Sequence, residues 1–145
     1  SRLVNPPGVT PIISEEQLWK GLETKARDPQ QFVPPISECK IQSDTGDKVV
    51  RIVRFGGGEP VQEDILIYQP SILYFDSPDK GHRVTNVVSY NEENEMVLTF
   101  SFAGGFPSKI PLKDNATPAE VNAVIGQAVE STLKKIRELV NEGKI

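Results

Sequence analysis

The sequence predicts an α+β domain in which an antiparallel sheet packs against one long C-terminal helix. Two observations predict this class. Between residues 37 and 102 the chain has short stretches rich in Val, Ile, Phe and Tyr, separated by turn-forming residues. Residues 117–145 then repeat apolar side chains at three- and four-residue spacing, the period of an amphipathic helix. Strands followed by one long helix are typical of α+β domains.

The composition narrows the class of protein. The chain has 145 residues, which fits one domain over residues 1–145. Its net charge is -4 and its Lys and Arg residues are scattered, which disfavours nucleic-acid binding. We find no apolar run long enough for a membrane span and no signal-peptide pattern. The single cysteine excludes an internal disulfide and is typical of a reducing compartment, so we expect a cytoplasmic protein.

Two short helices are expected near the N-terminus. Residues 1–13 contain three prolines and allow only a short edge strand over residues 2–5. Ser14 and Gln17 form a capping box that starts the first helix, which must end near Asp28 because a proline follows. One further short helical turn is expected before the next proline pair.

Six strands are expected in the middle of the chain. They are residues 37–43, 48–55, 61–69, 72–76, 83–90 and 95–102. The segments between them contain Gly, Pro, Asn and Asp, the residues that turns prefer. Because such short loops connect neighbouring strands, the six should form an antiparallel meander.

The C-terminal helix has clear start and stop signals. Thr117 and Glu120 form a capping box, Pro118 suits the first helical position, and Gly143 supplies the ending. About 25 residues make a rod roughly 37 Å long. The apolar stripe that should face the sheet consists of Val121, Val124, Ile125, Ala128, Thr132, Leu133, Ile136, Leu139 and Val140.

Three strands place one polar residue on the face assigned to the interior: Arg51, Glu63 and Asn86. Burying an unpaired charge is costly, so such groups persist inside only if they are paired or face water or a ligand. Arg51 and Glu63 are nearly equidistant from the turn at residues 56–60, so we expect them to lie opposite each other. This pattern predicts a wetted pocket with a polar cluster. The alternative is a misassigned face, or an ordinary ion pair near the rim.

The predicted pocket combines apolar walls with polar groups that would hold one end of a ligand. The polar ligand-binding residues are Arg51, Glu63, Asn86 and Tyr90. The apolar ones are Phe55, Phe75, Leu98 and Phe100, with Ile65, Val88, Val124 and Ala128 as further wall residues.

Several kinds of chemistry find no support in the sequence. The only histidine, His82, falls at a predicted hairpin tip and is interpreted as solvated, and Cys39 is interpreted as a buried structural thiol. No spacing of His and Cys indicates a metal site, and the glycines at 56–58 lack the Lys and Ser/Thr of a phosphate loop. Trp19 is expected to anchor the first helix in the core. We expect no cofactor and no metal, and no catalytic residue is assigned; the loop at 104–107 could gate the pocket.

Seven motifs carry a resemblance that covers nearly the whole chain. They are Leu18–Leu22, Phe32–Pro34, Arg51–Gly58, Asn86, Leu98–Phe100, Glu130–Thr132 and Ile136–Lys144. The arrangement resembles the START and birch-pollen-allergen type helix-grip (SRPBCC) fold. The motifs resemble a small bacterial and fungal family labelled after protein L of an acetylaranotin biosynthesis cluster. The resemblance implies a curved sheet around the long helix with a cavity between them. It implies no reaction, because helix-grip relatives include lipid carriers, hormone receptors and polyketide aromatases or cyclases.

Two functions remain open, and a third possibility is structural. The first is binding of a small hydrophobic or aromatic molecule, in secondary metabolism. The second is a cofactor-free cyclase, dehydratase or isomerase, in which Glu63 or Tyr90 moves a proton and Arg51 or Asn86 stabilises an enolate. An arginine beside Glu63 favours its charged form, which favours binding over proton donation. The third is a homodimer without a ligand, formed through an edge that exposes Ile72 and Tyr74.

Overall fold

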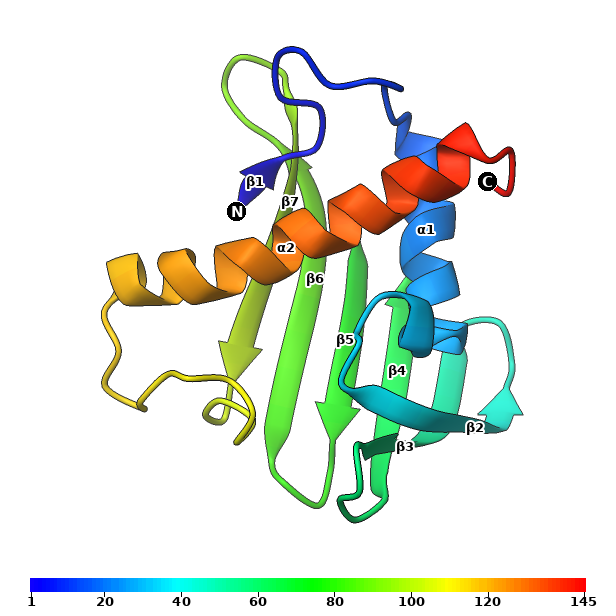
Figure 1. Cartoon of the computed structure of the whole chain (residues 1–145), viewed down its shortest axis with the longest axis vertical. Helices are drawn as coiled ribbons and strands as arrows, with labels where there is room; N and C mark the ends of the chain where they lie inside the picture. The colour runs from blue at the N-terminus through cyan, green and yellow to red at the C-terminus, as the bar shows by residue number, and fades with distance from the viewer.

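The computed structural model describes residues 1–145 as a seven-stranded antiparallel sheet crossed on one face by a long helix (Figure 1). The elements in chain order are β1 (Arg2–Leu3), α1 (Glu15–Arg27), a 3₁₀ turn (Pro29–Gln31), β2 (Ile36–Asp44), β3 (Lys48–Phe55), β4 (Val61–Tyr68), β5 (Ile72–Ser77), β6 (His82–Tyr90), β7 (Met96–Ala103) and α2 (Pro118–Asn141). The strand order is β1-β7-β6-β5-β4-β3-β2, so β2 to β7 form the predicted meander. The α+β helix-grip class is confirmed.

The predicted elements agree closely with the observed ones. Each of the six central strands begins and ends within one residue of its predicted bounds. The N-terminal edge strand exists, but it pairs with β7 over only two residues. The second short helix is a single 3₁₀ turn at Pro29–Gln31. Neither α-helix combines the length and apolar character that crossing a membrane requires.

Helix α1 begins at the predicted capping box. The Ser14 hydroxyl accepts from the Gln17 backbone N–H, and the Gln17 side chain accepts from the Ser14 N–H. The helix packs closely on α2 through Gly21, where an added Cβ would lie 2.5 Å from Cγ1 of Ile136. A residue without a side chain is therefore needed where the two helices approach each other.

Helix α2 also begins as predicted, with a capping box between Thr117 and Glu120. Its buried face consists of Ile125, Gly126, Val129, Thr132, Leu133, Ile136 and Leu139. The prediction that Ala128 faces the sheet is wrong, because Val129 takes that position and Ala128 is exposed. Neighbouring residues of a helix point about 100° apart, so assigning the stripe to the wrong neighbour moves a side chain to the solvent side.

The core lies between the inner face of the sheet, α1 and the C-terminal part of α2. Leu18 and Leu22 of α1, Leu98 of β7, and Val129 and Ile136 of α2 all belong to it. The first turns of α2 are less covered, since Val121 and Val124 are only half-buried. The predicted core position of Trp19 is confirmed. The interior is therefore least covered near the N-terminal end of α2.

Candidate functional site

Arg51 and Glu63 face each other across β3 and β4, as predicted. They are directly paired in the sheet register. Arg51 donates to Glu63 Oε1 from Nε at 2.9 Å and from Nη2 at 2.7 Å. Their side chains are 5% and 15% exposed. The alternative of an ion pair at the solvent rim does not hold, because both partners are largely withdrawn from water.

The other end of the Arg51 guanidinium holds helix α1. Its Nη1 donates to the backbone oxygens of Lys25 at 3.0 Å and Ala26 at 2.7 Å. Both carbonyls belong to the last turn of α1, where intrahelical partners are missing and a cation is electrostatically favoured. One side chain therefore joins β3, β4 and the C-terminal end of α1.

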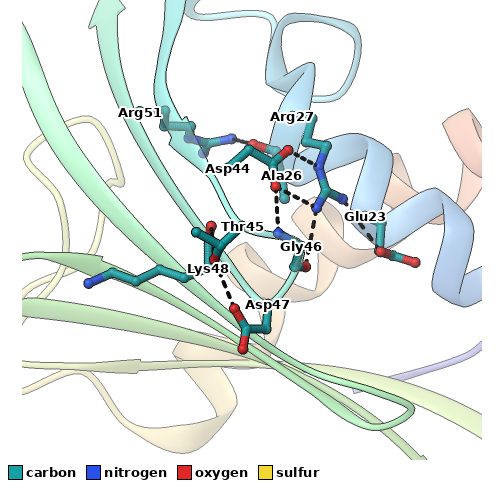
Figure 2. Close-up of polar contacts among 9 residues, drawn as sticks. All are labelled: Glu23, Ala26, Arg27, Asp44, Thr45, Gly46, Asp47, Lys48 and Arg51. Carbon is teal, nitrogen blue, oxygen red and sulfur yellow. Dashed lines mark hydrogen bonds and ion pairs between the residues drawn. The ribbon is translucent and has the colours of Figure 1, made fainter.

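A second arginine anchors the same end of α1 from outside (Figure 2). Arg27 donates to the carboxylate of Asp44 at 2.6 and 3.1 Å, to the Gly46 carbonyl at 3.3 Å and to Glu23 at 3.4 Å. The hydrogen bond from Arg27, with a smaller contribution from the Gly46 N–H, lowers the pKa of Asp44 to about 2. The last turn of α1 is thus fixed to the β2–β3 hairpin, and the same turn carries one inward side chain.

That side chain is Lys25, which sequence reasoning missed. It is 9% exposed, and its Nζ donates to Asn86 Oδ1 at 3.2 Å. The ammonium position is 4.0 Å from the ring centre of Phe100 and 5.4 Å from that of Phe75. Burial, with a further contribution from the nearby Arg51 charge, lowers the pKa of Lys25 to about 7. At neutral pH this buried amine is therefore partly uncharged.

A signal for Lys25 was present in the sequence. It lies three residues after Leu22 and seven after Leu18, on the apolar stripe of α1. A lysine on such a stripe normally extends its charged end to water. Here the end of α1 is tied down by Arg51 and Arg27, and the side chain remains under the helix.

Two buried donors have no hydrogen-bond partner in the protein: the Nδ2 of Asn86 and the Nε1 of Trp19. Asn86 is fully buried on β6, between Leu73 and Phe100 on the neighbouring strands. Most buried donors are paired, so an unpaired one requires an explanation. The polar cluster of Lys25, Arg51, Glu63 and Asn86 therefore retains unused hydrogen-bonding capacity.

A cavity of about 320 Å³ reaches this cluster at Glu63. It lies between the sheet ends and the loop at residues 104–117, and is lined by Phe55, Val61, Glu63, Ser77, Lys80, His82, Phe106, Pro107, Ser108 and Lys109. We call it the mouth cavity. Its size falls at the lower end of the range for small-molecule sites. The second carboxylate oxygen of Glu63, Oε2, accepts no hydrogen bond from the protein.

His82 is another functional candidate that sequence reasoning placed incorrectly. It is not a solvated tip residue: it is the first residue of β6, pairs with Ser77, is half-buried and lines the mouth cavity. The loop after β7 folds back over it, and Gly105 lies close to both His82 Nε2 and Asp114 Oδ1. This return of a distant loop leaves no periodic signal in the sequence.

A second cavity, of about 290 Å³, lies between β7 and the first turns of α2. Phe100 lines it from the sheet, and Val121 and Ile125 line it from the helix. This cavity has the predicted location between sheet and long helix. The one that contains Glu63 does not, because the loop before α2, and not α2 itself, forms its outer wall.

The remaining predicted site residues are separated from one another. Phe55 lines the mouth cavity, with the Lys109 ammonium 4.8 Å from its ring centre. Leu98 is fully buried in the core. The prediction that Tyr90 faces the pocket is wrong: it is 47% exposed at the end of β6 opposite to His82. Cys39 is half-buried, and burial raises the pKa of its thiol.

Comparisons with known proteins support the fold. A family model described as acetylaranotin biosynthesis cluster protein L matches residues 1–143. The structure is similar to the di-domain ARO/CYC StfQ from the steffimycin biosynthetic pathway, with a TM-score of 0.58, 12% identity, and 89% of this chain and 48% of that chain covered. It is also similar to the di-domain ARO/CYC BexL from the BE-7585A biosynthetic pathway, with a TM-score of 0.55, 11% identity, and coverage of 87% and 46%. The chain thus spans about half the length of these proteins. No curated protein matches the sequence significantly.

Proposed function

Because the chain belongs to the family of acetylaranotin biosynthesis cluster protein L, we propose that it binds a small hydrophobic or aromatic molecule in the mouth cavity. The observation that carries this proposal is the position of Glu63. One of its oxygens is held by Arg51 and the other accepts no hydrogen bond, while the residue itself lines the cavity. A charged acceptor in a partly apolar cavity is the kind of group that orients a ligand.

The walls of the cavity support an aromatic ligand. Phe55 lines it from β3 and Phe106 lines it from the loop after β7. Aromatic side chains offer large apolar area and specific stacking geometry. The family name and the two structural neighbours both refer to biosynthetic pathways. We therefore place the ligand in secondary metabolism.

A second candidate function is a cofactor-free reaction of the cyclase, dehydratase or isomerase type. The observation in its favour is Lys25, a buried amine beside the amide of Asn86 with a pKa of about 7. A base that is partly deprotonated at neutral pH suits proton abstraction next to a carbonyl group. The unpaired Nδ2 of Asn86 would support the enolate oxygen. In this function Glu63 orients the substrate.

Native mass spectrometry with a panel of aromatic polyketides and fatty acids tests the proposal, followed by titration of the best ligand. Glu63→Gln keeps an oxygen for Arg51 but removes the charge from the cavity. We expect it to weaken binding about 10-fold or more, the usual value of a hydrogen bond to a charged group. Glu59→Gln is the matched control, because Glu59 is exposed in the β3–β4 turn and does not line the cavity.

Each outcome has a clear meaning. If no member of the panel binds, or if Glu63→Gln binds as tightly as the native protein, the proposed binding function is wrong. If a polyketide is converted to product, and Lys25→Met abolishes turnover while binding is retained, the enzymatic function is selected instead.

A further inference from the structure

The rim of the mouth cavity is cationic. Lys80 reaches it from the β5–β6 turn and Lys109 from the loop after β7. Neither lysine forms an ion pair with a carboxylate of the protein. His82, the first residue of β6, also lines the cavity. We call Lys80 and Lys109 the cationic rim.

No negative charge inside the cavity balances the cationic rim. The only carboxylate that lines the cavity is Glu63, and its charge is already paired with Arg51 at 2.7 Å. Asp114 belongs to the same loop as Lys109 but does not line the cavity. A cavity whose unpaired charges have one sign concentrates ligands of the opposite sign. The mouth cavity therefore favours an anion.

The polar groups lie at two ends of the cavity. Ser77 pairs with His82, and Glu63 lies one position beyond the pair formed by Asp64 and Asp76. Glu63, Ser77 and His82 therefore form one row across three strands. Two strand spacings put about 10 Å between the backbones of Glu63 and His82. Glu63 offers a hydrogen-bond acceptor at the β4 end of this row, and the β5–β6 turn at the other end carries Lys80. The Lys109 ammonium lies 4.8 Å from the ring centre of Phe55.

We propose that the natural ligand is a hydroxylated aromatic acid, with its carboxylate at the cationic rim and its hydroxyl group donating to Glu63. This inference rests on the proposed binding function and narrows it to one chemical class. The aromatic body would lie between Phe55 and Phe106. A fused two-ring skeleton has about the length of the row and fits a cavity of about 320 Å³.

Hydroxynaphthoic acid is a suitable probe, because its fluorescence reports binding to the whole chain. The comparison ligands are hydroxynaphthamide, which lacks the charge, and naphthoic acid, which lacks the hydroxyl group. The test variant is Lys80→Gln combined with Lys109→Gln. The control is Lys113→Gln, since Lys113 is exposed in the same loop and does not line the cavity.

The acid should bind about 5-fold tighter than the amide, as expected for two partly exposed ion pairs. The double variant should remove this preference for the acid, and added salt should weaken only the acid. Lys113→Gln should change neither affinity. Naphthoic acid should bind more weakly than hydroxynaphthoic acid to the native protein, and the two should bind alike to Glu63→Gln.

Two results overturn the proposal in different ways. If the amide binds as tightly as the acid, or the double variant keeps the preference for the acid, the inferred ligand class is wrong although the cavity still binds aromatic molecules. If none of these probes and no member of the polyketide and fatty-acid panel binds, the proposed function fails together with the inference.

Discussion

The buried amine of Lys25 makes a quantitative prediction about stability and pH. Its pKa is about 7 in the folded protein, against an ordinary value of 10.5. Between these two values the unfolded chain holds a proton that the folded protein has lost. The free energy of unfolding therefore rises with pH across this window and levels off on either side. A difference of about 3.5 in pKa corresponds to an effect on the order of 5 kcal/mol.

The variant Lys25→Met removes this titration. At pH values below 7 it should be more stable than the native protein, because the native protein must then bury a charge. The advantage should shrink as the pH approaches 10.5. The variant also leaves Asn86 Oδ1 without its donor, which costs about 1–3 kcal/mol at every pH. Only the pH dependence of the difference between the two proteins is therefore diagnostic.

Urea unfolding at about pH 6, pH 8 and pH 10 measures this difference directly. Lys20→Met is the matched control, because Lys20 is exposed on the outer side of α1, where its only ion pair is with Glu16. The control should leave the pH dependence of the native protein unchanged. A stability difference between Lys25→Met and the native protein that stays constant across these pH values would refute the reasoning.

Two further predictions concern the arginines that hold α1. Arg51→Met should destabilise the protein by about 3–5 kcal/mol in urea unfolding, because Glu63 would remain as an unpaired buried charge. Arg51→Met combined with Glu63→Gln should recover much of this loss. A double variant as unstable as the single one would contradict the explanation. Arg27→Ala should raise the pKa of Asp44 from about 2 toward 3.8 in an NMR titration. The pair stabilises the folded protein above pH 3.8 and loses this effect as the pH falls through about 2, so the variant should lack this pH-dependent stabilisation. An unchanged titration midpoint of Asp44 would contradict the assignment of Arg27 as the main cause.

The fold could be predicted because its signals are local. Capping boxes at Ser14 and Thr117 mark both helices, and alternation marks the strands, so each depends on residues only a few positions apart. The pairing of Arg51 with Glu63 could be predicted for the same reason, since a short turn determines the register of a hairpin.

The site was predicted less completely because its assembly is not local. Lys25 depends on how α1 docks, and His82 depends on the return of a loop that begins more than twenty residues later. Tyr90 was misplaced because alternation continues to the end of β6, where the side chain is 47% exposed. Periodicity identifies the inward face but does not show how far the cover extends.

The double attachment of Arg51 links the interior to the helix surface. The same guanidinium that holds the wall of the mouth cavity at Glu63 also secures the final turn of α1. A single side chain therefore connects Glu63 with the final turn of α1, and any effect of one on the other would act in both directions. The outer side of the same helix carries Lys20, Glu23 and Arg27, which border a shallow surface pocket with Ile145.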